Sequence, residues 1–119
     1  TIISYSRMVP VSLEAAEDLR KEGIGVEVVD LRTLSPLDIG TIKKSVEKTG
    51  KVVIVEEDCK TGGVGAEVSA KIMEECFDYL DAPVKRVAAS DTPIPCTTAL
   101  EHLAIPDKER VLAVVNSIL

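Results

Sequence analysis

The stretch "VVIVEEDCKTGGVGAEVSAKI", from Val52 to Ile72, combines a strand, a glycine-rich turn and the start of a helix. Its apolar run Val52–Val55 does not alternate with polar residues, which is typical of a strand covered on both faces in a parallel sheet. From Val64 onward, apolar residues recur every four positions, as on the buried side of a helix. The stretch therefore predicts a strand–turn–helix unit in an α/β fold.

The same alternation of strand and helix continues on both sides of this unit. Strands are predicted at 1–6, 24–31, 51–56 and 84–89, and helices at 9–22, 35–49, 64–80, 98–103 and 106–118. Such an order indicates a three-layer α/β sandwich, a mainly parallel sheet with helices on both faces. The third strand is the most apolar and the fourth carries Lys85 and Arg86, which suit an edge, so we expect the strand order 2-1-3-4. Residues 1–119 are expected to form a single domain.

Local signals also indicate where helices begin and end, and which side they bury. Ser35 is a favourable N-cap with Pro36 at the first helical position, so the second helix is expected to begin there and to end at Gly50. In the first helix, three apolar residues share a face and predict the side turned to the sheet: Leu13, Ala16 and Leu19.

The composition argues against several classes of function. The formal net charge is −6 and aromatic residues make up 3% of the chain, so nucleic acid is a poor partner. No apolar run approaches the roughly 20 residues that a membrane span needs. The three cysteines form no Cys-x-x-Cys pair, which disfavours a disulfide framework or a zinc site: Cys59, Cys76 and Cys96. We therefore expect no nucleic acid, membrane or metal ion as a partner.

The glycine cluster raises the question of a phosphate site. It consists of Gly62, Gly63 and Gly65, and it follows three acidic residues, Glu56, Glu57 and Asp58. A dinucleotide fingerprint requires a third glycine where Val68 stands, and the Lys-Ser/Thr end of a Walker loop is missing. The carboxylates would repel a phosphate and can themselves accept the free N–H groups of the helix. We interpret the glycines as a close-packing turn.

No catalytic constellation stands out elsewhere. Cys96 and His102 could act as a nucleophile and its base, but their spacing of six places them on different faces of a helix and Pro95 interrupts the segment. Asp91 in "SDTPIP" is interpreted as a turn acceptor. The residues alone predict neither catalytic, cofactor-binding nor metal-ligating side chains.

Five segments, in this order, carry a resemblance to a known family: "VVDLRTLSPLD", "VVIVEEDCKTGGVGAEVSAKI", "LDAPVKRV", "SDTPIP" and "IPDKERV". They resemble the C-terminal, transketolase-like domain of the beta subunits of thiamine-diphosphate-dependent 2-oxo acid dehydrogenases, with the pyruvate dehydrogenases as nearest members. The resemblance covers the chain and implies that it is a piece of a longer beta subunit. In the family the glycine loop is a packing turn.

The resemblance also implies a function. The parent enzyme would be a heterotetramer that oxidatively decarboxylates a 2-oxo acid and transfers the acyl group to lipoamide. Thiamine diphosphate and Mg²⁺ would bind outside this chain, which would hold no cofactor and be inactive alone. Its expected partners are the alpha subunit, a second beta subunit and the subunit-binding domain of the dihydrolipoyl acyltransferase. The expected location is the bacterial cytoplasm, or the matrix of a mitochondrion or plastid.

Two residues carry over from the family as partner-docking positions, the side chain of Asp81 and the terminal carboxylate of Leu119. Cys96 departs from the family, which usually has an aromatic residue or a histidine at this position. One alternative stays open: a free-standing flavodoxin-like domain that binds a nucleotide or a phosphorylated ligand at the carboxyl ends of its strands. Its site would be formed by Ser6, Arg7, Glu57 and Gly62–Gly65.

Overall fold

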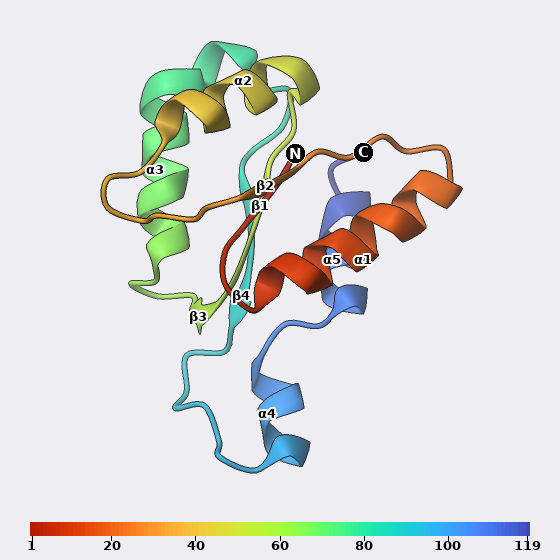
Figure 1. Ribbon diagram of the computed structural model, residues 1–119, viewed down its shortest axis with the longest axis vertical. Helices are drawn as coiled ribbons and strands as arrows, with labels where there is room; N and C mark the ends of the chain where they lie inside the picture. Colours follow the sequence, from red (N-terminus) through yellow and green to blue (C-terminus); the bar gives the residue numbers. More distant parts are fainter.

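The computed structural model describes residues 1–119, and strands and helices alternate along them (Figure 1). The elements are β1 (Ile2–Ser4), α1 (Met8–Lys21), β2 (Val28–Asp30), α2 (Ile39–Thr49), β3 (Val53–Cys59), α3 (Val64–Cys76), the 3-10 turn η1 (Phe77–Tyr79), β4 (Lys85–Ala89), α4 (Thr98–Ala104) and α5 (Lys108–Asn116). None of the helices combines the length and the apolarity that crossing a bilayer requires.

The four strands form one parallel sheet in the order β2-β1-β3-β4. In register, Ile2 of β1 lies beside Val28 on one side and beside Val53 on the other, and Val53 lies beside Lys85 of β4. The predicted fold class and strand order are therefore confirmed. The charged fourth strand lies at an edge, where Lys85 can point to water.

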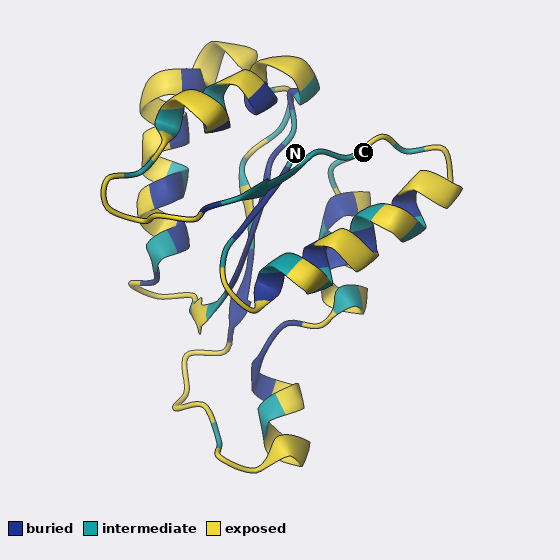
Figure 2. Cartoon of the chain, in the orientation of Figure 1, coloured by how far each residue is buried: buried dark blue, intermediate teal, exposed yellow.

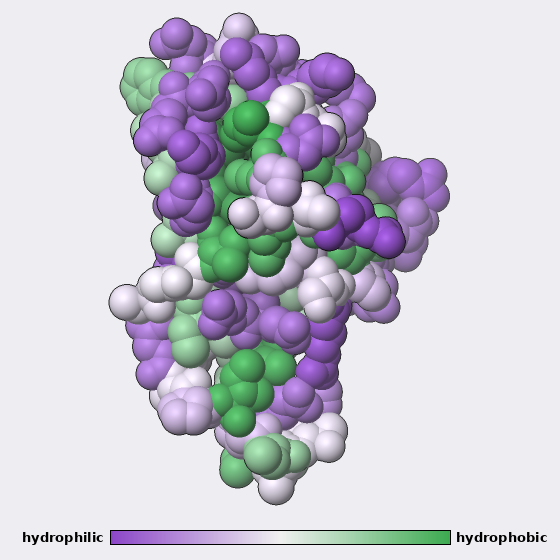
Figure 3. Space-filling view, turned by 60° about the vertical axis from the view of Figure 1, so that its left-hand side comes forward, coloured by the Kyte–Doolittle hydropathy of each residue, from purple (hydrophilic) through white to green (hydrophobic).

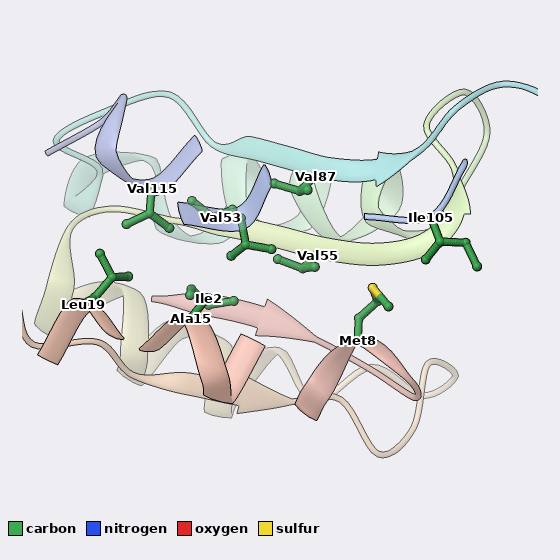
Figure 4. Packing of buried hydrophobic residues seen from close by; sticks show 10 residues of the cluster. Ile2, Met8, Ala15, Leu19, Val53, Val55, Val87, Ile105 and Val115 are labelled. Carbon is green, nitrogen blue, oxygen red and sulfur yellow. The ribbon is translucent and has the colours of Figure 1, made fainter. Parts of the chain in front are cut away.

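Helices cover both faces of this sheet and create two cores. Helices α1 and α5 pack on one face, and α2 and α3 pack on the other (Figures 1 and 4). The first core consists of Ile2, Met8, Ala15, Leu19, Val53, Val55, Val87, Ile105, Val111 and Val115, and the second of Ile3, Leu31, Ile42, Val46, Val52, Ile54, Val68, Ile72 and Cys76. Successive residues of β3 alternate between the two cores, so its unbroken apolar run is explained by burial on both sides.

Helix α2 begins later than the sequence predicts. Its N-cap is Asp38, whose Oδ1 accepts from the Thr41 N–H at 3.0 Å, and Ser35 lies outside the helix. The carboxylate also accepts from the Thr41 hydroxyl at 2.7 Å, and these two hydrogen bonds hold the pKa of Asp38 below its usual value. The predicted end is confirmed, because Gly50 closes α2 in the left-handed conformation with φ 67°.

Helix α1 buries a different face from the predicted one. Its buried residues are Met8, Ser12, Ala15 and Leu19, whereas the side chain of Leu13 is 53% exposed. Ser12 occupies the buried stripe where an apolar residue is expected, and Leu13 lies about 100° farther around the helix. Because Ser12 is polar, the apolar pattern did not indicate that its side of the helix is buried. Of the three predicted residues, only Leu19 is fully buried.

The structure predicts a sharp difference between these two leucines. Leu19→Ala removes a fully buried side chain and is expected to lower the free energy of unfolding by about 2–5 kcal/mol. Leu13→Ala changes a solvated position and should stay within about 0.5 kcal/mol of the wild type. Urea unfolding monitored by circular dichroism measures both. Equal losses for the two variants would contradict the observed face of α1.

Candidate functional site

The carboxylate of Glu56 lies at the centre of the glycine turn. Glu56 continues β3 and its side chain has no exposed surface. One oxygen accepts from Arg86 of β4 at 2.7 Å. The other accepts from the Gly65 N–H at 2.6 Å and from the Tyr5 hydroxyl at 3.3 Å. One buried carboxylate thus connects β3 with β4, with the first turn of α3 and with Tyr5, the residue that follows β1.

The glycines of the turn make room for this carboxylate. A Cβ atom at Gly65 would lie 2.7 Å from Cδ of Glu56, and one at Gly63 would lie 3.1 Å from a Glu56 oxygen and closer still to the carbonyl oxygen of Cys59. Only Gly62 has a positive φ, 77°. Close packing is thus the role of Gly63 and Gly65, while Gly62 supplies the left-handed backbone conformation.

This arrangement leaves no cradle for a phosphate. The Gly65 N–H, which a phosphate at the start of α3 would need, already donates to Glu56. Partial burial and the negative charge of Glu56 also raise the pKa of the Tyr5 phenol well above its usual value, so the hydroxyl stays protonated as a donor. The turn is filled by the protein's own carboxylate, as the preceding acidic residues had suggested.

The other residues of the alternative nucleotide site offer no free cation. Arg7 donates to Glu101 of α4 at 2.6 Å, so its charge is already paired. Ser6 has an unusual positive φ of 52° and an exposed side chain. Glu57 adds a further carboxylate nearby. An anionic ligand would therefore meet more negative than positive charge at this end of the sheet.

Cys96 and His102 do not form a thiol–imidazole pair, as their spacing in the sequence had indicated. Cys96 and His102 are both exposed, and no hydrogen bond joins them. Asp91, interpreted as a turn acceptor, instead reaches the glycine turn: its carboxylate accepts from the Thr61 N–H at 2.9 Å and the Thr61 hydroxyl at 2.6 Å. These hydrogen bonds lower the pKa of Asp91. No three His, Cys, Asp or Glu side chains lie together in a way that could hold a metal ion.

The two predicted docking residues approach the same turn from different parts of the chain. The Asp81 N–H donates to the carbonyl oxygen of Gly50 at 2.8 Å, and Lys51 donates to a terminal oxygen of Leu119 at 2.9 Å. Because Gly50 and Lys51 are consecutive, Asp81 and Leu119 both contact the α2–β3 turn. This turn lies at the amino ends of the strands, where Figure 1 also shows the C-terminus. Both residues are exposed.

An open groove of about 480 Å³ lies beside Asp81. Its lining includes Met73, Phe77, Leu80, Asp81, Pro83 and Val84, and the side chains of Met73 and Phe77 are 43% and 63% exposed. The groove therefore offers apolar contact next to the Asp81 carboxylate, a combination suited to a partner with basic and apolar groups.

Sequence reasoning missed three of these features. The pairing of Arg86 with Glu56 could have been suspected, because a carboxylate that continues a buried strand needs a cation. Arg7 and Glu101 are 94 positions apart in the sequence, so no local pattern could predict that they form an ion pair. Met73 lies in α3 and Phe77 in η1, and both fall outside the four-residue apolar repeat that begins at Val64, so nothing in the sequence singled out their exposure.

The glycine turn gives a second prediction, with a matched control. Gly65 and Gly40 are each the second residue of a helix, and only Gly65 faces a buried carboxylate. Gly65→Ala should lower the free energy of unfolding by about 1–3 kcal/mol, because the new methyl group displaces Glu56. Gly40→Ala should be neutral or stabilise by up to about 1 kcal/mol through helix propensity. Thermal unfolding compares them, and an unchanged Gly65→Ala would refute the packing role.

Comparison with known proteins identifies the family. Residues 1–111 match the model of the transketolase C-terminal domain. The chain is 46% identical over 118 residues to the pyruvate dehydrogenase E1 component subunit beta of Rickettsia bellii, covering 99% of this chain and 36% of the relative. It is 51% identical over 112 residues to the corresponding subunit of Staphylococcus epidermidis, covering 94% of this chain and 34% of the relative. A mitochondrial subunit beta-1 of Arabidopsis thaliana is 49% identical over 112 residues, covering 94% and 31%.

The fold comparison agrees. A solved structure described as "Split gene transketolase, inactive beta4 tetramer" superposes with a TM-score of 0.83 at 33% identity, covering 99% of this chain and 37% of that one. The chain thus spans about a third of the length of the proteins it matches. The family resemblance recognised in the sequence is confirmed: the chain belongs to the transketolase C-terminal domain family, and its curated relatives are beta subunits of pyruvate dehydrogenase E1 from bacteria and mitochondria.

Proposed function

We propose that this chain is the C-terminal assembly domain of the beta subunit of a pyruvate dehydrogenase-type enzyme. It would supply contacts between subunits and dock the subunit-binding domain of the dihydrolipoyl acyltransferase. The observation that carries the docking role is the joint placement of Asp81 and the Leu119 carboxylate around Gly50 and Lys51. Residues 1–119 would be one domain of a longer subunit, since the relatives are about three times as long.

The residues present do not fit thiamine diphosphate. The glycine turn at the start of α3 is the place where such a fold could cradle a diphosphate, and the Glu56 carboxylate fills it. Arg7, the obvious cation at the carboxyl ends of the strands, is paired with Glu101. The decarboxylation of the 2-oxo acid would therefore depend on groups outside this chain, and the chain would contribute no catalytic residue.

The electrostatics of the amino end of the sheet support docking of a basic partner. The chain carries a net charge of −6, which steers a cationic domain toward it. Lys51 already neutralises part of the charge at Leu119, so the exposed carboxylate of Asp81 is the stronger attraction. The groove next to them adds exposed Met73 and Phe77, which can bury apolar surface once the partner has arrived.

Self-association is the second part of the proposal. The related split-gene transketolase is described as a tetramer of beta chains, so in that protein beta chains associate with one another. At 33% identity and a TM-score of 0.83, the shared domain is a reasonable source of such contacts. We therefore include a second beta subunit among the partners, together with the alpha subunit of the complete enzyme.

The docking role is tested in the complete enzyme. Asp81→Asn removes one exposed charge without changing size, and we expect the affinity for the isolated subunit-binding domain to fall by about threefold to tenfold. Removal of Leu119 should act in the same direction. Glu14→Gln, an exposed carboxylate on α1, is the matched control and should leave affinity unchanged.

Calorimetric titration at two salt concentrations measures these affinities, and the difference between wild type and Asp81→Asn should shrink at high salt. Decarboxylation of free 2-oxo acid should stay at the wild-type rate in every variant. Wild-type affinity in both Asp81→Asn and the Leu119 deletion would remove these residues from the docking surface. Loss of decarboxylation with intact docking would show instead that this domain reaches the reaction centre.

A further inference from the structure

The carboxylate of Asp81 lies against Gly50, the residue that ends α2. A Cβ atom at Gly50 would lie 2.9 Å from Cγ of Asp81 and closer still to its Oδ2. The Asp81 N–H also donates to the carbonyl oxygen of Gly50 at 2.8 Å, so the backbone and the side chain of Asp81 both contact this one glycine. The carboxylate therefore occupies the space that any other residue at position 50 would fill with its own side chain.

Gly50 is itself held in a single conformation. It is buried, and its N–H donates to the carbonyl oxygen of Val46 at 2.8 Å. Its φ of 67° belongs to the left-handed region, which strains any residue that carries a Cβ atom. The same glycine thus meets two requirements, since it closes α2 and leaves room for the carboxylate of Asp81.

The place where this carboxylate lies is favourable for a cation. The C-terminal end of a helix carries partial negative charge, and a nearby cation is stabilised there. Lys48, the basic residue in the last turn of α2, is already paired with Glu27. Asp81 takes part in none of the ion pairs of the chain. The carboxylate and the end of α2 therefore act together on an approaching basic group.

This end of α2 is accessible to a partner. Figure 2 shows that α2 is exposed along its outer side, and mostly hydrophilic side chains cover the same end of the molecule in Figure 3. Asp81 is exposed and lines the groove that also contains Met73 and Phe77. A basic side chain that reaches the carboxylate would thus place its apolar neighbours at the groove.

We propose that Gly50 is a positioning residue for docking: because it has no side chain, it fixes the Asp81 carboxylate over the C-terminal end of α2, where a basic side chain of the subunit-binding domain is bound. This inference deepens the proposed docking role and rests on it. It adds that the direction of the carboxylate, and not its charge alone, determines the affinity. Gly50 acts through Asp81 and need not touch the partner.

The test compares two left-handed glycines. Gly23 follows α1 with φ 85°, and a Cβ atom there would meet no other residue within 4 Å, so it is the matched control for Gly50. Alanine strains the backbone at either position, and both variants should unfold at a lower temperature than the wild type. In the complete enzyme only Gly50→Ala should weaken binding of the isolated subunit-binding domain, by about threefold to tenfold. Calorimetric titration beside thermal unfolding measures both effects.

Two further variants separate the position of the carboxylate from the stability of the turn. With Asp81→Asn already present, Gly50→Ala should change the affinity by less than about twofold, because the displaced group no longer carries a charge. Asp81→Glu keeps the charge but moves the carboxylate one methylene group farther from the backbone. Position 81 is exposed, so this variant should fold, and its affinity should also fall by about threefold or more.

Wild-type affinity in Asp81→Glu would overturn the positioning role, whether or not Gly50→Ala assembles. Equal weakening by Gly23→Ala and Gly50→Ala would also overturn it, since strain at a helix end would then account for the loss. In both cases a weakened Asp81→Asn would leave the docking role itself in place. Wild-type affinity in Asp81→Asn and in the Leu119 deletion would instead reject the docking role on which the inference rests.

Discussion

The buried carboxylate of Glu56 is the interaction on which the carboxyl end of the sheet depends. It reaches Arg86 across the sheet, the Gly65 N–H at the start of α3 and the hydroxyl of Tyr5 after β1. A buried charge is strongly destabilising once its partner is removed, by about 3–5 kcal/mol. The surrounding residues are therefore constrained together. Gly63 and Gly65 must lack side chains, Arg86 must stay in place at the edge strand, and Tyr5 must remain a donor.

That constraint separates the roles of the two ends of the sheet. In many open α/β folds, the carboxyl ends of the strands bind the ligand. Here Glu56 fills this end of the sheet, and the hydrogen bonds of Asp91 and Glu101 attach the segment that contains α4 to it. The amino end instead presents Asp81 and the terminal residue around the α2–β3 turn. The groups at the carboxyl end are thus engaged with one another, while Asp81 and Leu119 stay exposed at the amino end, and this contrast supports the proposed assembly role.

The fold class, the strand order and the close packing at the glycine turn could be predicted from the sequence. A central strand is buried on both faces, which explains the unbroken apolar run Val52–Val55. An edge strand tolerates charge, which explains Lys85 and Arg86. These two signals predicted the strand order 2-1-3-4 correctly. The start of a helix and its buried face were harder to predict, because several neighbouring residues could serve equally well. Asp38 rather than Ser35 caps α2, since either side chain could accept the free N–H groups. A buried Ser12 also shifted the apparent face of α1 toward Leu13. The pairs Glu56–Arg86 and Arg7–Glu101 required knowledge of which distant residues the sheet brings together.

Glu56 occupies the site where this fold would otherwise accept a phosphate. The most direct test is to follow the Gly65 amide by ¹⁵N–¹H NMR while inorganic phosphate and then ADP are added. With the N–H already donated to Glu56 at 2.6 Å, the amide resonance should show no saturable shift with either ligand. A saturable shift of Gly65 with a micromolar midpoint would show that the carboxylate yields to a phosphate, and it would contradict the account.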